Sequence, residues 1–487
     1  MASQRTWPLT EAVLILARRA ARSQAPELAK AGRQAEARLL QPLHVALVGL
    51  VSAGKSTLLN ALLETAVAPT AGGECTRVLY TFSHNRYTTA SVRPRNRTAP
   101  LPLHFAGGRL SSELPLPHRQ IDRVDVTLPA NLLEQVTVLD TPGLASTNAD
   151  TSAITQELLE NDTLDAARTA DAIIFCINTP LKDAEAEAVR LFRSGRAGLR
   201  LTGGTAVAVL TKADLLTAAD RLTHDRRATW KHAADLAQKL STDHADLFAD
   251  VLPVIGLLAE TAQTGALREY HARLLAALAR EWSPETAGPV LLHEKLFYAQ
   301  PGPGDGGQRQ ELVALLGLFG IGTVLDELRA GAPATAAGIT QVALQASGFS
   351  EMSRRLRIQL GSRSDVLKSG AQLNILLDRA QAAREWDTFD AVQKLLDRPE
   401  MFELKVFGLA KVLAAGRVKP PPALADQAWI LLSTGLPRVS GREAASRARE
   451  WREWAMLTNL EGQSVARVMV RAWQLAAQQR GGPGDRA

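Results

Sequence analysis

One stretch near the start of the chain, residues 44–62, limits the possible folds more than any other feature. A short apolar run from Val45 to Val48 has the length and composition of a buried strand. It leads into Gly49-Leu50-Val51-Ser52-Ala53-Gly54-Lys55-Ser56, which fits the pattern G-x-x-x-x-G-K-[ST]. Leucine and alanine residues then follow at helical spacing. A strand, a glycine-bounded loop and a helix in this order predict a phosphate-binding loop.

The residue types of this loop suit a polyphosphate. Glycines allow a close backbone approach, so that loop N–H groups and the positive end of the following helix can face phosphate oxygens. Lys55 supplies a point charge for the β- and γ-phosphates, and the Ser56 hydroxyl is suited to bind Mg²⁺. We therefore predict nucleotide contacts along the loop, from Gly49, Ser52, Ala53, Gly54, Lys55, Ser56 and Thr57.

The chain has 487 residues, which is too long for one ordinary domain. From Leu43 onward, strand and helix patterns alternate, and this alternation predicts an α/β domain with a mostly parallel sheet and helices on both faces. Residues 94–119 are rich in Pro, Gly and Arg and are expected to form loops or a short hairpin. The candidate strands are residues 43–48, 77–82, 88–93, 121–127, 134–140, 172–178, 205–210 and 250–255, with helices at 152–168, 181–196 and 227–248.

Outside this region the pattern is helical. Residues 9–40 show helical spacing, and we expect them to pack on the later helical region. A Pro- and Gly-rich linker lies near residue 300, and beyond it no strand is predicted. Trp429, Trp451 and Trp473 are expected in a helical core. The predicted organisation is an N-terminal helix (1–41), a nucleotide-binding domain (42–298), a linker (299–308) and an all-α bundle forming a neck and trunk (309–487).

Two later motifs indicate which nucleotide binds. Asp140-Thr141-Pro142-Gly143 follows an apolar strand and fits D-x-x-G. In this position Asp140 would hold Mg²⁺ through a water molecule, and the Gly143 N–H would face the γ-phosphate. Thr211-Lys212-Ala213-Asp214 fits [NT]-K-x-D. The Asp214 carboxylate would accept hydrogen bonds that guanine donates and adenine cannot, which favours GTP strongly.

Two weaker signals complete the predicted site. Gly256, after the strand at 250–255, is a candidate backbone cap over the base. A residue between Lys55 and Asp140 must complete the Mg²⁺ ligands and sense the γ-phosphate. Thr70 and Thr76 are the candidates, and Thr76 is preferred because it directly precedes a predicted strand. The predicted metal set is Ser56, Thr76 and Asp140.

These motifs together resemble the dynamin superfamily of large GTPases. The segments "APTAGGECTR", "PVIGLLAETA", "LLGLFGIG" and "RSDVLK" are similar to the isoniazid-inducible dynamin-like proteins of actinobacteria, from about Pro42 to Ala380. The resemblance implies a GTPase head, helical bundles as neck and membrane-facing trunk, and head-to-head dimers that stimulate hydrolysis. It also implies that Ser52 neutralises charge between the phosphates during hydrolysis. Leu144 stands where small GTPases carry a water-orienting glutamine.

The composition of the chain limits the cellular compartments in which we expect it. With only Cys75 and Cys176 a disulfide framework is excluded, which favours a reducing cytosol. The longest apolar run, 312–325, is shorter than the roughly 20 residues of a membrane span. Residues 329–349 are uncharged after Arg329 and are either a membrane tip or, as we prefer, a buried or poorly ordered connection in the bundle. A basic set, expected to be a solvated helix face or a contact for anionic lipid, consists of Arg354, Arg355, Arg357, Arg363 and Lys368.

Three functions fit the sequence. The first is a cytoplasmic GTPase, peripheral at the inner face of the cell membrane, that remodels or maintains that membrane. In it, Ser52, Lys55, Thr76 and Gly143 would serve hydrolysis with GTP and Mg²⁺ as cofactors. The second is a soluble switch that recruits a protein partner through its helical region, and the third is a GTP-binding scaffold with little turnover. The partners expected are a second copy, anionic lipids and a paralogous dynamin-like protein, but no nucleic acid.

Overall fold

The computed structural model describes residues 8–49, 52–68, 78–95, 99–111, 113–142, 170–178, 206–216, 225–244, 247–248, 250–361, 364–396, 402, 409, 413, 418–434 and 439–478. Its strands are β1 (Leu43–Gly49), β2 (Tyr80–His84), β3 (Thr89–Pro94), β4 (Leu101–Pro102), β5 (Phe105–Ala106), β6 (Arg109–Leu110), β7 (Ile121–Leu128), β8 (Val136–Asp140), β9 (Ala172–Ile177), β10 (Ala206–Leu210) and β11 (Val251–Pro253).

The helices of the first half are α1 (Pro8–Ala20), α2 (Pro26–Leu39), α3 (Lys55–Leu63), α7 (Arg226–Asp243) and α8 (Gly256–Gln263). The later ones are α9 (Glu269–Glu281), α10 (Pro284–Val290), α11 (Glu294–Ala299), α12 (Gly306–Arg329), α13 (Ala336–Ala346), α14 (Phe349–Leu356), α15 (Ser364–Ala382), α16 (Trp386–Leu396), α18 (Pro422–Thr434), α19 (Gly441–Ala455) and α20 (Leu460–Gln478). Short helical turns are η1 (His118–Gln120), η2 (Asn131–Glu134), η4 (Ala213–Leu215) and the π-helical η5 (Arg357–Gly361).

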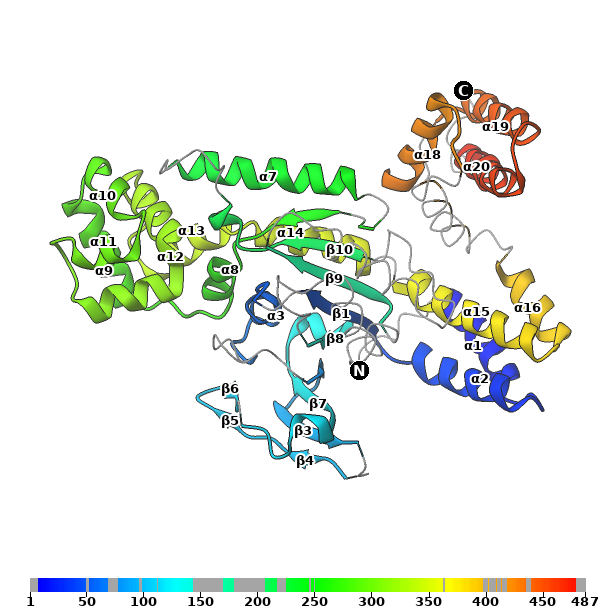
Figure 1. Ribbon diagram of the computed structural model, residues 1–487, viewed down its shortest axis with the longest axis horizontal. Helices are drawn as coiled ribbons and strands as arrows, with labels where there is room; N and C mark the ends of the chain where they lie inside the picture. Colours follow the sequence, from blue (N-terminus) through cyan, green and yellow to red (C-terminus); the bar gives the residue numbers. More distant parts are fainter. Residues whose placement is uncertain are drawn as a thin grey trace, which may run out of the picture.

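Nine strands form one sheet in the order β11-β10-β9-β1-β8-β2-β7-β3-β4 (Figure 1). The five strands from β11 to β8 are parallel, and β2 joins β8 in the antiparallel sense. β1 lies between β8 and β9, with Leu47 opposite Asp140 and Gly49 opposite Cys176. This pairing confirms the predicted mostly parallel sheet. It also brings the carboxyl ends of the central strands to one edge, where α/β sheets bind ligands.

Helices cover both faces of this sheet, as predicted. Side chains alternate between faces along a strand, and β9 illustrates the division. Ile174 faces a cavity that α14 also lines. Its neighbour Phe175 packs on Phe248, which follows α7, with ring centroids 5.9 Å apart. The expected helices at 152–168 and 181–196 lie outside the described residues.

The sequence at 94–119 forms the short structures expected of it. β4 pairs with the edge strand β3, and β5 and β6 form a two-stranded hairpin. Gly107 and Gly108 make its turn with φ values of 59° and 82°, which glycine adopts readily.

The N-terminal region consists of two helices, where the sequence analysis expected one. Pro26 occupies the first turn of α2, and Ala25 before it has extended backbone, since a residue preceding proline is disfavoured in the helical region. Both helices pack in one apolar cluster with α15 and α16, which includes Val13, Leu28 and Leu373. The Asp365 side chain of α15 accepts hydrogen bonds from the backbone N–H groups of Leu9 and Thr10, at 3.1 and 2.8 Å.

Residues 299–308, the expected linker, lie within a single packed unit. Apolar side chains before and after this segment share one cluster, which contains Trp282, Phe297 and Leu312. Arg309 bridges across it, because its guanidinium donates to the carbonyl oxygens of Phe297 and Pro303 at 2.9–3.1 Å. The domain bounds given from sequence stay a prediction, but the described core is continuous across residue 300.

Residues 329–349 form the end of α12 and helix α13, which packs on α8 and α9. Ile339 and Ala343 are buried there, so the segment is a connection within the bundle rather than an exposed apolar tip. Among the helices in the described ranges, none combines the length and the apolar character that a membrane span requires.

The helices α18, α19 and α20 share a separate apolar cluster (Figure 1). Trp451 and Trp473 are buried in it, as expected. Trp429 was also expected in the core, but it is 40% exposed. It stands on α18, whose apolar residues are spread around the helix, so that spacing alone did not identify the inward face.

A buried ionic cluster joins the sheet to the N-terminal helices. Arg38 of α2 pairs with Asp171, which is almost fully buried and also accepts a hydrogen bond from the His44 backbone N–H at 2.8 Å. Lys368 of α15 donates to the carbonyl oxygens of Leu39 and Gln41 at 2.7 and 2.5 Å. Burial pushes the pKa of Asp171 upward, and the Arg38 charge opposes that shift.

Removing Arg38 should therefore destabilise the protein strongly. Arg38→Ala leaves a buried carboxylate unpaired, and we expect about 3–5 kcal/mol of lost stability in urea unfolding followed by circular dichroism. Arg18→Ala breaks the exposed pair with Glu36 and should cost about 1 kcal/mol or less. Equal losses in the two variants would show that the buried pair has no special weight.

Candidate nucleotide-binding site

The phosphate loop connects β1 to α3 with two residues in left-handed backbone. Gly54, directly before α3, has φ 77° and ψ 18°, and Ser52 has φ 61°. Gly49 at the end of β1 is required for another reason. A Cβ on this residue would lie 2.5 Å from the carbonyl oxygen of Cys176 in β9, closer than real contacts allow. Leu50 and Val51 lie outside the described residues.

Lys55 opens helix α3 and is only 7% exposed. Its Nζ donates a hydrogen bond to the carbonyl oxygen of Gly49 at 3.2 Å, which holds the side chain across the loop that precedes it. The N-terminus of α3 and the Lys55 ammonium group thus give this side of the loop a positive potential. The arrangement suits an anionic polyphosphate.

Asp140 ends β8 beside this positive charge. It is 2% exposed, and its Oδ1 has no hydrogen-bond partner among the described residues. Burial raises the pKa of Asp140 to about 6, while the Lys55 charge opposes the rise. The next residue, Thr141, donates its hydroxyl to the Leu47 carbonyl at 3.0 Å and fixes the end of β8 on β1. A buried carboxylate oxygen with no partner fits a divalent cation, since such ions favour oxygen ligands.

Thr211 joins the predicted base-binding motif to the phosphate loop. Its hydroxyl donates to the carbonyl oxygens of Ala53 and Ile177, at distances of 2.7 and 3.0 Å. Lys212 follows in left-handed backbone, φ 53°, and turns the chain into η4, which carries Asp214. Burial raises the pKa of Asp214, opposed by a backbone hydrogen bond and by Lys212. A partly desolvated carboxylate at this point is suited to accept hydrogen bonds from a base.

Gly256 completes the described part of the site. It is the first residue of α8, and a Cβ there would meet Thr57 of the phosphate loop at 3.4 Å. The structure therefore brings together the predicted residues at 52–57, 140, 211–214 and 256. Thr70, Thr76, Gly143 and Leu144 lie outside the described residues, so their roles stay predictions.

The sequence analysis missed a polar pair behind the loop. Asn60 of α3 is fully buried and donates to the Glu260 carboxylate of α8 at 2.7 Å. Its amide oxygen accepts the Ala68 N–H at 2.8 Å. Asn60 thereby anchors the chain directly before residues 69–77, which contain Thr70 and Thr76. Its one visible signal was a polar residue within the apolar run "LLNALL".

The fold and this site define a phosphate-loop protein of the GTPase class. A dynamin family model matches residues 45–190. Isoniazid-induced protein IniC of Mycobacterium tuberculosis, in strains CDC 1551 / Oshkosh and ATCC 25618 / H37Rv, is 30% identical over 439 residues, 86% of this chain and 86% of the relative. The chain belongs to the dynamin family as a bacterial dynamin-like protein. It binds guanine nucleotide and hydrolyses GTP.

Two solved structures show more distant similarity. One is from an oligomerised bacterial dynamin pair described as sensing and tethering membranes, with 14% identity, a TM-score of 0.35, and coverage of 98% of this chain and 76% of that chain. The other is a variant of Era from Aquifex aeolicus bound to GDP·AlF4⁻, with 18% identity, a TM-score of 0.25, and coverage of 45% of this chain and 52% of that chain.

The buried Asp140 should lower the stability of the nucleotide-free protein at neutral pH. Its folded pKa lies above the unfolded value, so the stability it adds is present at low pH and is lost as the pH rises through about 6. We expect Asp140→Asn to gain on the order of 3 kcal/mol at pH 7.5 and clearly less at pH 5, while GTP turnover falls. Thermal unfolding at both pH values measures this, with the exposed Asp243→Asn as control. A gain independent of pH would contradict the assignment.

Proposed function

We propose that this chain is a Mg²⁺-dependent GTPase that dimerises head to head and remodels or maintains the membrane at its inner face. The main support for nucleotide binding is the hydrogen bond from the Thr211 hydroxyl to the Ala53 carbonyl oxygen, because it connects the predicted guanine-binding motif to the phosphate loop. A GTP molecule bound by both motifs would have its phosphates over Lys55 and its base at Asp214.

The metal would be held by Ser56, Thr76 and, through water, Asp140. The Oδ1 of Asp140, which has no hydrogen-bond partner in the described part of the chain, supports this assignment. When bound, Mg²⁺ supplies positive charge next to the β- and γ-phosphate oxygens. Lys55 and the loop N–H groups would bind the same phosphates, and their positive charge would stabilise the negative charge that develops during in-line attack by water. Ser52 would act between the phosphates, and the Gly143 N–H would face the γ-phosphate.

Guanine preference should depend on Asp214. Asp214→Asn replaces one acceptor oxygen by a donor amide that opposes the guanine N–H groups, so we expect GTP affinity to fall at least about tenfold while ATP gains. Equilibrium titration with fluorescent GTP and ATP analogues measures both constants. Lys55→Ala is the matched control and should lose both nucleotides. Unchanged selectivity in Asp214→Asn would remove this residue from base recognition.

The exposed turn between α19 and α20 supports membrane attachment. Met456 and Leu457 are 78% and 86% exposed at this turn, the highest values among the large apolar residues described. Trp454 lies one turn back on α19 and packs on Trp451. Apolar side chains at the end of a helical hairpin, with a tryptophan beside them, suit insertion into the interfacial region of a bilayer.

If the enzyme assembles on membranes, its rate of GTP hydrolysis should depend on protein concentration and on lipid. We expect GTP turnover per molecule to rise with protein concentration and with anionic liposomes, and the liposome effect to disappear in Met456→Ser/Leu457→Ser. Ile15→Ser, at another exposed apolar residue, is the matched control. Co-sedimentation reports binding separately from catalysis. If neither concentration nor liposomes change the rate, the membrane and dimer proposals fail together.

That outcome would favour a soluble GTP-dependent switch that recruits a protein partner through its helical region. One observation favours this alternative. Within the basic set, Arg354 and Arg355 pair with Glu351, and Arg355 also pairs with Asp250. Lys368 is buried. These three of the five basic residues therefore offer little free positive charge to an anionic bilayer, while Arg363 lies outside the described residues.

A further inference from the structure

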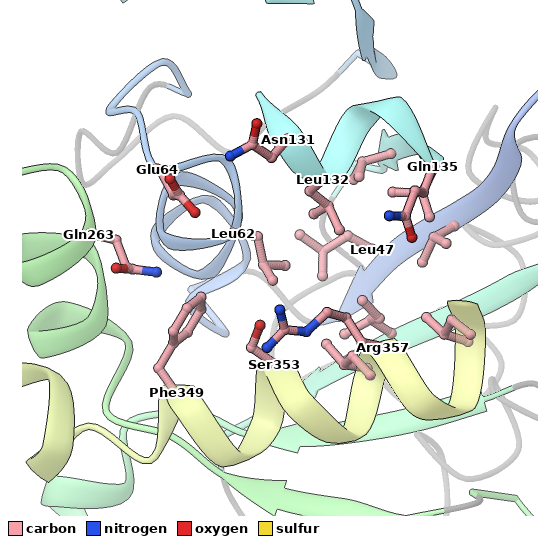
Figure 2. Close-up of a pocket in the computed structure, with 16 residues that line it drawn as sticks. Leu47, Leu62, Glu64, Asn131, Leu132, Gln135, Gln263, Phe349, Ser353 and Arg357 are labelled. Atoms are coloured by element: carbon pink, nitrogen blue, oxygen red, sulfur yellow. The ribbon is translucent and has the colours of Figure 1, made fainter. Parts of the chain in front are cut away.

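A cavity of about 260 Å³ lies between the sheet and helix α14 (Figure 2). Its inner walls are apolar and come from three strands, α3 and α14, including Val45, Leu47, Leu62, Val138, Ile174 and Leu356. Polar side chains also line it, and they are Glu64, Asn131, Gln135, Gln263, Ser353 and Arg357. The cavity is separate from the nucleotide site. Helix α3 begins at the phosphate loop with Lys55, but it lines the cavity from its opposite end, with Leu62 and the adjoining Glu64.

The inner part of this cavity does not suit water. Water needs several polar partners, whereas the inner walls here offer aliphatic side chains. Left empty, such a space deprives its lining atoms of dispersion contacts, and cavities of this kind take up small apolar molecules. A water molecule occupies about 30 Å³ of liquid, so the space is equivalent to on the order of nine groups of that size, roughly the room that a short alkyl chain needs.

Among the described lining residues, only Arg357 and Glu64 carry a charge, and both are exposed. Arg357, which directly follows α14, points toward the middle of the cavity, next to Ser353 and below Leu62, whereas Glu64 lies near Gln263 at one end (Figure 2). Arg357 also differs from the arginines of α14. Arg354 and Arg355 both pair with Glu351, but within the described part of the chain no carboxylate pairs with Arg357.

The backbone at Arg357 is unusual as well. Helix α14 passes at this residue into the π-helical turn η5, Arg357–Gly361, whose Leu360 also lines the cavity. π-Helical turns are rare and are frequent at functional sites. Arg357 and Leu360 both line the cavity, so this turn brings a cation and an apolar side chain to it.

We propose that this cavity binds a single-chain amphiphile with an anionic head group. The alkyl chain lies among the aliphatic side chains of β1, β8, β9 and α3, and the head group accepts hydrogen bonds from the Arg357 guanidinium. Free fatty acids and phosphate-headed single-chain lipids share this chemistry. The site is distinct from the GTP site and from the α19–α20 turn.

Binding is tested on the full-length protein by isothermal titration with decanoate, below its micellar concentration. Decyl phosphate is compared with decanoate, so that a phosphate head group is distinguished from a carboxylate. The neutral decanol and the cationic decyltrimethylammonium test whether the site prefers an anion. We expect saturable binding of one decanoate or decyl phosphate per chain. Affinity should rise with chain length up to about ten carbons and then stop rising, because the volume is limited.

Two pairs of variants locate the site. Ser353→Phe fills the cavity and should weaken decanoate binding at least tenfold, whereas Ser350→Phe on the exposed side of α14 should not. Arg357→Gln should weaken decanoate about tenfold and leave decanol unchanged, with Arg354→Gln as its control. Glu64→Gln removes the one lining carboxylate and should strengthen binding of the anion or leave it unchanged.

Each variant must first give the wild-type circular dichroism spectrum and GTP affinity, so that loss of binding is not loss of fold. Three outcomes would overturn the proposal. The first is a lack of saturable binding to the wild-type protein, which is expected if other residues of the chain fill the space. The second is equal binding of decanoate to the wild type and to Ser353→Phe. The third is a preference for the cationic probe.

Discussion

The position of β1 between β8 and β9 determines most of the site. Its pairing with β8 sets Asp140 opposite Leu47, and its pairing with β9 sets Gly49 against Cys176. The second contact is so close that only glycine fits, and the chain leaves the sheet there to form the phosphate loop. The two registers of β1 therefore fix the beginning of the loop and the carboxylate beside it, and β9 in turn pairs with β10, the strand that leads to Thr211. A change in either pairing would separate groups that must act on one phosphate chain.

Asp140 shows what this arrangement costs in stability. Its carboxylate is buried, one oxygen has no partner among the described residues, and its pKa is raised to about 6. A group in this condition opposes folding at neutral pH unless a cation compensates it. Stability given up at one residue for the sake of ligand binding is common at functional sites. If the proposed Mg²⁺ compensates this charge, the protein should be most stable when nucleotide and metal are bound.

The parts that could be predicted from sequence are those coded locally. Each of these parts is a short segment whose residue types are set by its structure or its chemistry. They are the strand at 45–48, the loop at 49–56 and the motifs at 140 and 211–214. Features made by distant residues could not be predicted. Asn60 and Glu260 are 200 positions apart, and nothing near either residue indicates the other. The break between α1 and α2 could have been predicted from Pro26 alone. The exposed face of α18 could not be predicted, because apolar residues surround that helix.

The packing of α1 has a consequence for the synthesis of the protein. The Leu9 N–H is bound by Asp365, 356 positions later, and the apolar face of α1 packs on α15. At about 5–20 residues per second, a ribosome adds that length of chain in roughly 20–70 s. During this time the first helix can pack on α2 but lacks its partners α15 and α16, while the strands of the sheet are emerging and pairing. The sheet can therefore form before α1 and α2 pack on α15 and α16, and the nascent N-terminal segment is where binding by a chaperone would help most.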